Sequence, residues 1–305
     1  MRRPNLFFIG HPRSGSGLLD GFLDGHPDIF MARKELHYFG ADLRYHEPPR
    51  SLENYLQHFK KAPSSAKWVG EASTWMLISE RAAAEVDAFT RGDARVLLTL
   101  REPASWLQSL HSHLVFTGDE DIADFGAALA AEPDRRAGRR LPRWSIPANA
   151  THYRAHAAYA AQVQRWFDRF GREQVKVLLL DDLRADPAGT YDSVLRWLDL
   201  PVDFPGKAKV LAANERTRNS NRRVRSAWVR AQVNRPSRRR VLEGVDPAPV
   251  PGVGLLIRAA RRLNIEYVER PPADKQVVAD LRRALAPEVD ALEALLGRDL
   301  SAWRR

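Results

Sequence analysis

The chain has 305 residues, of which 44% are hydrophobic and 28% are charged, a composition typical of a globular protein. It contains no cysteine, which excludes a disulfide scaffold, a cysteine nucleophile, thiolate zinc sites and iron–sulfur ligation. The net charge of +10 is concentrated in residues 206–270, where 16 basic and five acidic residues give +11. This concentration indicates either an anionic ligand or surface near the segment, or an arginine-rich surface that is simply solvated.

No apolar run approaches the roughly 20 residues that cross a bilayer. The four apolar residues Leu6–Ile9 near the N-terminus are too few for the apolar region of a signal peptide. We therefore expect a cytoplasmic protein without a transmembrane segment. No internal repeat or low-complexity linker interrupts the chain, so we expect a single domain over residues 1–305.

Short apolar runs alternate with helical patterns along the chain. The predicted strands are Leu6–Gly10, Ile29–Ala32, Trp68–Glu71, Val96–Leu100 and Val175–Leu180. The predicted helices are Ser16–Leu23, Ser79–Phe89, Pro103–Leu114, His156–Phe170 and Pro187–Leu198. Near-continuous apolar strands are typical of a sheet that helices cover on both faces. The alternation predicts an α/β fold of three layers around a central parallel sheet.

Other segments depart from this alternation. Residues 117–151 are polar and rich in arginine, and we expect an irregular loop there. Residues 201–252 hold six prolines around a basic helix expected near Arg222–Val233. The C-terminus is expected to form a helical tail with two apolar stripes, which Pro287 should separate.

The first predicted strand runs into a glycine-rich loop, His11–Gly17, and then into a helix. The N–H groups of such a turn and the positive end of the helix dipole bind an anion. Gly10 and Gly15 have the spacing of the nucleotidase P-loop, G-x-x-x-x-G-K-[ST], but Ser16 and Gly17 occupy the positions of its lysine and its hydroxyl residue. The sequence therefore predicts a P-loop-type anion site without the magnesium–ATP machinery. The alternative is an ordinary strand–turn–helix junction.

This loop resembles the 5′-phosphosulfate loop of sulfotransferases that use 3′-phosphoadenosine 5′-phosphosulfate (PAPS). In that family a Pro-[Lys/Arg]-Ser/Thr-Gly-Thr-Thr-like sequence joins a strand to a helix. Pro12–Gly17 matches it, with Gly17 in place of the last hydroxyl residue. The resemblance implies that Arg13 is the catalytic cation. It also implies that the cofactor is bound by the loop residues Arg13, Ser14, Gly15, Ser16 and Gly17.

A second match follows the fourth predicted strand, which ends in Arg101-Glu102-Pro103, with Ser109 two helical turns further on. An arginine and a serine at this spacing can converge on one phosphate through charge-assisted bonds and a hydroxyl group. Taken alone, Arg-Glu-Pro is also a helix-start signal. In the sulfotransferases an arginine and a serine at this spacing bind the 3′-phosphate of PAPS, which implies that role for Arg101 and Ser109.

Gly25–Ile29 and Lys34–Phe39 together resemble the segment that carries the general base in heparan-type and many bacterial sulfotransferases. The resemblance places this base at Glu35 and a contributing histidine at His37. A carboxylate within hydrogen-bond reach of an acceptor hydroxyl can remove its proton as sulfur is attacked. The alternative is that Lys34 and Glu35 form a solvated pair and that His37 is a surface residue.

Gly70–Trp75 resembles the Gly-Glu-x-Ser/Thr-Pro segment of the same family, with Thr74 in place of the proline. Glu71 is either a second site carboxylate or a helix-capping group. Ala72 stands where heparan-modifying members carry a catalytic lysine, which weakens the expectation of a heparan-like acceptor. Asp181 and Asp182, after the fifth predicted strand, are expected to hold the following loop.

The resemblance implies a PAPS-dependent sulfotransferase. Such an enzyme moves a sulfuryl group to a hydroxyl or amine of a small-molecule or carbohydrate acceptor and releases 3′-phosphoadenosine 5′-phosphate (PAP), without a metal. The basic segment 206–270 is expected near the nucleotide and the acceptor mouth, with Arg216, Arg218, Arg222 and Arg223 as candidates there.

Two other functions are alternatives. A P-loop kinase that uses ATP and magnesium is disfavoured by the missing lysine after Gly15. A nucleic-acid-binding protein could use segment 206–270, but no zinc-finger or RNA-recognition motif accompanies the charge, so nucleic acid is not the expected partner.

Overall fold

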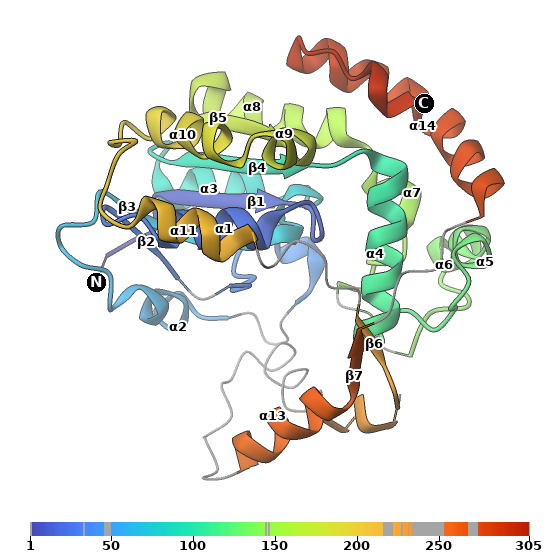
Figure 1. Cartoon of the computed structure of the whole chain (residues 1–305). Helices are drawn as coiled ribbons and strands as arrows, with labels where there is room; N and C mark the ends of the chain where they lie inside the picture. Colours follow the sequence, from blue (N-terminus) through green and yellow to red (C-terminus); the bar gives the residue numbers. More distant parts are fainter. Residues whose placement is uncertain are drawn as a thin grey trace.

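The computed structural model describes residues 2–32, 34–45, 50–143, 145, 147–215, 222–226, 228–230, 232–233, 253–267 and 274–304. A five-stranded sheet lies at its centre, and all neighbouring strands are parallel (Figure 1). In spatial order its strands are β2 (Ile29–Met31), β3 (Trp68–Ala72), β1 (Leu6–Gly10), β4 (Arg95–Leu100) and β5 (Val175–Leu179). The predicted parallel sheet is confirmed, and each predicted strand end lies within one residue of the observed one.

Alternating side chains of the central strand divide the core into two apolar layers. Phe7 and Ile9 belong to the layer covered by α3 (Ala82–Thr90), α4 (Pro103–Thr117), α8 (Tyr159–Gln174) and α14 (Lys275–Leu296). Leu6 and Phe8 belong to the layer covered by α1 (Ser16–Asp24), α9 (Leu180–Ala185), α10 (Pro187–Trp197) and α11 (Lys207–Glu215). All four side chains are fully buried, which is why β1 is apolar without a break.

The five predicted helices correspond to α1, α3, α4, α8 and α10, with ends that differ by up to four residues. Gly171 has φ 72° and ψ 163° and interrupts the helical geometry inside α8. Short elements complete the described chain around the sheet: 3-10 turns at Ala41–Leu43, Gln57–Phe59, Thr74–Leu77 and Ser301–Arg304, and the helices α2 (Leu52–Leu56) and α7 (Tyr153–His156). No helix in the described ranges is long and apolar enough to span a membrane.

The C-terminal tail is one helix, so the predicted break at Pro287 is wrong. α14 runs through Pro287 from Lys275 to Leu296. Its buried side chains follow one another at intervals of three or four residues, as Leu281, Leu285, Val289 and Leu292. A continuous apolar face on one helix therefore packs into the core with α4 and α8, and its burial offsets the hydrogen bond that proline removes.

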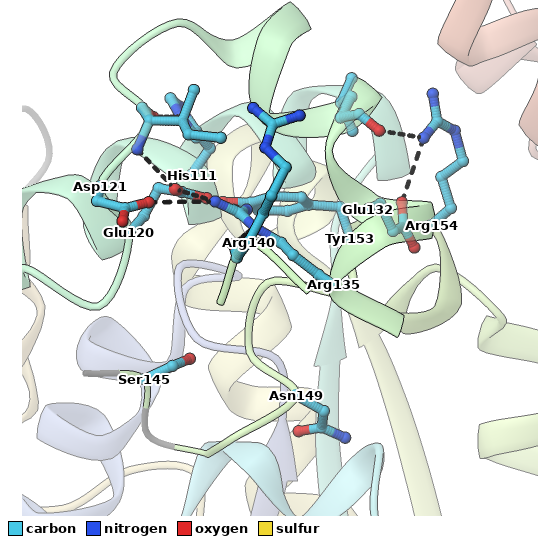
Figure 2. A network of polar contacts seen from close by, with 12 residues as sticks. His111, Glu120, Asp121, Glu132, Arg135, Arg140, Ser145, Asn149, Tyr153 and Arg154 are labelled. Carbon is cyan, nitrogen blue, oxygen red and sulfur yellow. Dashed lines mark hydrogen bonds and ion pairs between the residues drawn. The ribbon is translucent and has the colours of Figure 1, made fainter. Parts of the chain in front are cut away.

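The predicted irregular loop 117–151 holds two short helices, α5 (Phe125–Ala130) and α6 (Glu132–Arg136). A buried ion pair organises them (Figure 2). The guanidinium of Arg135 donates two hydrogen bonds to the Glu120 carboxylate, at 2.5 and 2.6 Å, and both side chains are fully buried. The Tyr153 hydroxyl donates a third, at 2.7 Å. The polar composition of this segment therefore conceals a buried polar core, which periodicity cannot reveal.

The pKa of Glu120 reflects the same network. Burial alone would raise it, but the bonds from Arg135, from the Ile122 amide and from Tyr153 hold it below its ordinary value. The carboxylate is thus charged and fully paired, and its side-chain partners join α6 to α7. Removing one partner would leave the other as an uncompensated buried charge.

Replacing Arg135 with methionine should therefore lower the free energy of unfolding by about 3–5 kcal/mol, the range for breaking a buried pair. Denaturant unfolding measures this loss. Arg139→Met is the matched control, because Arg139 pairs with Asp134 at the surface, and its unfolding curve should overlay that of the wild type. A loss below about 1 kcal/mol for Arg135→Met would contradict the buried-pair account.

The predicted basic helix near Arg222–Val233 begins instead with a strand. β6 (Arg222–Val224) pairs antiparallel with β7 (Ile265–Tyr267), and α13 (Val253–Leu263) leads into β7. Asn264 lies between α13 and β7. Its side chain fixes this junction, because it accepts from the Ser226 amide at 2.8 Å and donates to the Ser226 carbonyl at 3.0 Å. This long-range pairing cannot be inferred from local helical periodicity.

Candidate active site

The glycine loop lies where β1 ends and α1 begins. Gly10 has φ 138°, and a Cβ there would lie 3.0 Å from the Thr99 carbonyl oxygen of β4. Gly15 has φ 94° and precedes α1, and a Cβ there would lie 2.8 Å from Leu180 Cδ1. Both positions therefore need glycine, for conformation and for space. The conformation of the turn therefore depends on both glycines.

The start of α1 is equipped to bind an anion. The amides of Ser16 and Gly17 have no acceptor within the helix, and no acidic residue lies in the first turn. Gly17 opens onto free space, since a Cβ there would meet no atom within 4 Å. The Ser14 side chain is fully buried, and its hydroxyl has no hydrogen-bond partner among the described residues. These donors fit a phosphate or sulfate group.

Two arginines approach this loop from neighbouring strands. Arg13 lies in the loop with φ 72°, and its side chain is exposed. Arg101 follows β4, and its Nη1 lies 3.5 Å from the Arg13 carbonyl oxygen, while its Nε donates to Ser105 Oγ at 3.1 Å. The cations predicted for the two phosphate subsites therefore come together at one edge of the sheet.

Ser109 is in α4, as predicted, and is 1% exposed. The hydroxyl bonded to Arg101 Nε is that of Ser105, one turn earlier in the same helix. Sequence reasoning did not select Ser105, although the spacing of four residues from Arg101 was visible. The joint contact of Arg101 and Ser109 with a phosphate stays a prediction.

A buried histidine supports the loop from below. His11 is fully buried, and its Nε2–H donates to Gln162 Oε1 at 2.9 Å. Its ring stacks on Trp106 with 4.3 Å between the centroids, and Trp106 Nε1 donates to the Pro12 carbonyl at 2.8 Å. Burial lowers the pKa of His11 to about 3, so the ring is neutral. Sequence reasoning missed this support, because its members are separated by up to 151 residues.

Glu35 is held beside the loop by the end of β3. The Thr74 amide donates to Glu35 Oε2 at 2.9 Å, and the Thr74 hydroxyl donates to Oε1 at 3.0 Å. The neighbouring Lys34 does not form a solvated pair with Glu35, since its Nζ donates to the Ser16 carbonyl at 2.8 Å. Lys34 thus attaches this segment to the start of α1, and Glu35 attaches it to the residues that follow β3.

The Glu35 side chain remains 34% exposed, so it can meet a ligand. Its burial raises its pKa, while Lys34 and the two Thr74 donors oppose that rise. His37 Nε2 lies 3.6 Å from Glu35 Oε2. The carboxylate is therefore oriented by donors on one side and accessible on the other, as a proton acceptor requires.

His37 is not a surface residue. Its side chain is 11% exposed, and its ring stacks on Tyr45 with 3.9 Å between the centroids. Its amide donates to Ser73 Oγ at 3.1 Å, and its φ is 49°. These contacts fix the ring next to Glu35.

Glu71 lies within β3 and is fully buried, and it caps no helix. Burial raises its pKa to about 7, against the lowering effect of the Tyr55 and Ser73 hydroxyls, and the charge of Glu35 adds to the rise. The alternative of a helix cap is therefore wrong. Glu71 is a second carboxylate behind the site, half protonated near neutral pH.

The raised pKa of Glu71 has a consequence for stability. The folded protein binds this proton more tightly than the unfolded chain, whose carboxyl has the ordinary value of 4.5. The stabilisation is complete below that value and is lost as the pH rises to about 7. Between about pH 5.5 and pH 8 the free energy of unfolding should fall by about 2 kcal/mol on this account.

Denaturant unfolding of the wild type and of Glu71→Gln at both pH values measures this effect. The glutamine cannot titrate, so its stability should lack this part of the pH dependence. If the free energy of unfolding falls by the same amount in both proteins between the two pH values, Glu71 does not hold a proton in the folded state.

Asp181 and Asp182 tie down the C-terminal end of the chain. Asp181 Oδ2 accepts from Trp303 Nε1 at 2.9 Å, and Asp182 accepts two bonds from the Arg298 guanidinium. Their role is structural, as predicted, but both lie in α9 and their side chains bind the C-terminal segment rather than the loop that follows them. Arg216 and Arg218 lie outside the described residues, and so do the side chains of Arg222 and Arg223, although the latter two belong to β6.

No protein-family model matches the chain. A solved sulfotransferase from Alicyclobacillus acidocaldarius is 27% identical with a TM-score of 0.69, and the match covers 100% of both chains. The sulfotransferase fold is therefore shared over the whole chain.

Relatives found by sequence are also named as sulfotransferases. The bifunctional heparan sulfate N-deacetylase/N-sulfotransferase 1 of Caenorhabditis briggsae is 24% identical over 209 residues, 66% of this chain and 23% of that protein. The heparan sulfate glucosamine 3-O-sulfotransferase 3A1 of Mus musculus is 24% identical over 216 residues, 65% of this chain and 46% of that protein. The chain thus spans less than half the length of these relatives. The chain is therefore similar to sulfotransferases in sequence and in fold.

Proposed function

We propose that the protein transfers a sulfuryl group from PAPS to a hydroxyl or amine of a small-molecule or carbohydrate acceptor and releases PAP. One observation carries this proposal. The hydrogen bond from Lys34 Nζ to the Ser16 carbonyl joins the anion-binding loop to the residue next to Glu35. An anion in the loop is therefore close to a carboxylate that Thr74 orients. Sulfuryl transfer needs both groups together.

The residues divide the reaction between them. The acceptor atom attacks sulfur, the bond from sulfur to the phosphate oxygen breaks, and the acceptor proton passes to Glu35. Arg13 and the amides of Gly15, Ser16 and Gly17 stabilise the negative charge on the sulfuryl and leaving oxygens. His37 lies beside the base, and Arg101 with Ser109 holds the 3′-phosphate. Because two relatives are named for heparan sulfate, a sulfated polysaccharide of that class is one candidate acceptor. Ala72 argues against it, since heparan-modifying members carry a lysine at this position.

The nucleotide preference tests the role of Arg101. PAP carries the 3′-phosphate and 5′-AMP does not, so PAP should bind more tightly. Charge-assisted bonds to a phosphate contribute about 1.5–3 kcal/mol each, or roughly 10- to 100-fold in affinity. Calorimetry should show this preference in the wild type and its loss in Arg101→Ala. Arg196→Ala, on the exposed side of α10, is the control and should keep it. Equal affinities of the wild type for PAP and 5′-AMP would remove the assignment.

Glu35→Gln tests the general base. Glutamine keeps the size of the side chain but cannot accept a proton at neutral pH, so turnover of a hydroxyl acceptor should fall roughly 10²- to 10⁴-fold. PAP affinity should stay within twofold of the wild type, because Glu35 faces the acceptor. Arg13→Ala should reduce both turnover and affinity. Near-normal turnover of Glu35→Gln would place the base elsewhere, with His37 or Glu71 as the next candidates.

Thr74 opposes the rise that burial causes in the pKa of Glu35. Its hydroxyl donates to Glu35, and this bond lowers the pKa of the carboxyl. In Thr74→Val the amide bond remains and the hydroxyl bond is lost, so the pKa of Glu35 should rise. The acidic limb of the kcat/KM profile should then move to higher pH. Thr74→Ser keeps the hydroxyl and should restore the wild-type limb. Identical limbs in all three proteins would show that Thr74 does not tune the base.

A further inference from the structure

The most exposed large apolar side chains of the described chain lie in one small unit. Trp228 is 70% exposed, Leu256 is 71% exposed and Leu263 is 77% exposed. Outside this unit the highest value is 51%, at Leu141. Single exposed leucines need no explanation, but a group of three on one unit marks an interaction site.

This unit, called here the basic hairpin, consists of residues 222–226, 228–230, 232–233 and 253–267. Asn264 is 7% exposed, and its side chain bonds to both the amide and the carbonyl of Ser226. The Arg225 amide donates to the Asn264 carbonyl at 2.9 Å. These bonds join the end of α13, next to Leu263, to the chain just before Trp228. The apolar residues are therefore parts of one folded element.

The basic hairpin is attached to the end of α4. Arg230 Nη1 donates to the Val115 carbonyl at 2.6 Å. Figure 1 shows α13 projecting away from the central sheet, beyond β6 and β7. The unit is therefore fixed to the body at one end and presents α13 at the other.

The sequence of α13 is amphipathic. Leu256, Ala259 and Leu263 recur at intervals of three and four residues and are all exposed, so they form one apolar face. The helical positions of Arg258, Arg261 and Arg262 lie on the opposite side. A short helix with leucine on one face and arginine on the other is typical of peptides that lie in a lipid interface.

Charge decides which partner this surface fits. The basic hairpin holds seven arginines and one acidic residue, Glu266. A second copy of the chain would bring two such clusters together, and a nucleic acid would neutralise the arginines but leave the leucines and Trp228 in water. An anionic bilayer surface satisfies both sets, with phosphates for the arginines and acyl chains for the apolar side chains.

We propose that the basic hairpin is a docking surface for anionic lipid bilayers, in which Trp228, Leu256 and Leu263 enter the interface while the arginines contact lipid phosphates. Seven of the 16 basic residues of segment 206–270 belong to this surface. The proposal does not depend on the catalytic one.

Co-sedimentation of the full chain with vesicles tests this directly. The wild type should bind phosphatidylcholine vesicles that contain phosphatidylserine, should not bind pure phosphatidylcholine vesicles, and should dissociate as salt rises. Leu256→Asp/Leu263→Asp should bind at least about tenfold more weakly, because it places charge in the apolar face. Leu141→Asp is the control, since Leu141 is exposed outside the basic hairpin, and it should bind as the wild type does.

Brominated lipid provides a second measurement that does not rely on the aspartate variants folding. It should quench tryptophan fluorescence of the wild type on anionic vesicles, and Trp228→Phe should remove most of this quenching. Three results would overturn the proposal: no binding to anionic vesicles, equal binding to neutral ones, or a dimer in solution that Leu256→Asp/Leu263→Asp dissolves. The last would assign the surface to a second copy of the chain.

Discussion

The candidate site depends on one constraint, that neighbouring parallel strands end at the same edge of the sheet. β3, β1 and β4 are adjacent, so the residues that follow them meet. Thr74 follows β3, the glycine loop follows β1, and Arg101 follows β4. The hydrogen bond from Lys34 to Ser16 then brings Glu35 to the same edge. Each group sits at the end of a rigid strand or in a segment tied to one, and this preorganisation is what charge stabilisation requires.

Buried polar groups stabilise this edge from within. Burial holds His11 neutral under the loop, against the opposing effect of its bond to Gln162, which fixes the ring in place. The ring therefore supports the loop without adding charge to it. Glu71 is a carboxyl behind Glu35 that shares its region of the core with Tyr55 and Ser73. Ser73 links this layer to the segment that carries Glu35, since its hydroxyl accepts from the Leu36 and His37 amides. The position of the segment that carries Glu35 is therefore fixed by contacts with buried groups.

The sequence predicted the sheet because the strands are near-continuous apolar runs, and it predicted the loop because glycine is required at positions 10 and 15. It did not predict that α14 continues through Pro287, because the packing of both apolar stripes on one face is a tertiary effect. It did not predict the Glu120–Arg135 pair, since charged residues in a polar segment read as solvated. For the site, the resemblance selected Arg13 and Glu35, whereas Ser105, Thr74 and His11 acquired roles only through contacts between distant segments.

Sulfuryl transfer from PAPS is tested most directly by measuring PAP release in the presence of a metabolite extract. Mass spectrometry of the extract then detects the sulfated product. The wild type should release PAP at a rate that chelator treatment does not change, and at least one metabolite should gain the mass of a sulfuryl group. Arg13→Ala should abolish both signals. PAP release that requires magnesium, or no sulfated product with any extract, would contradict the account.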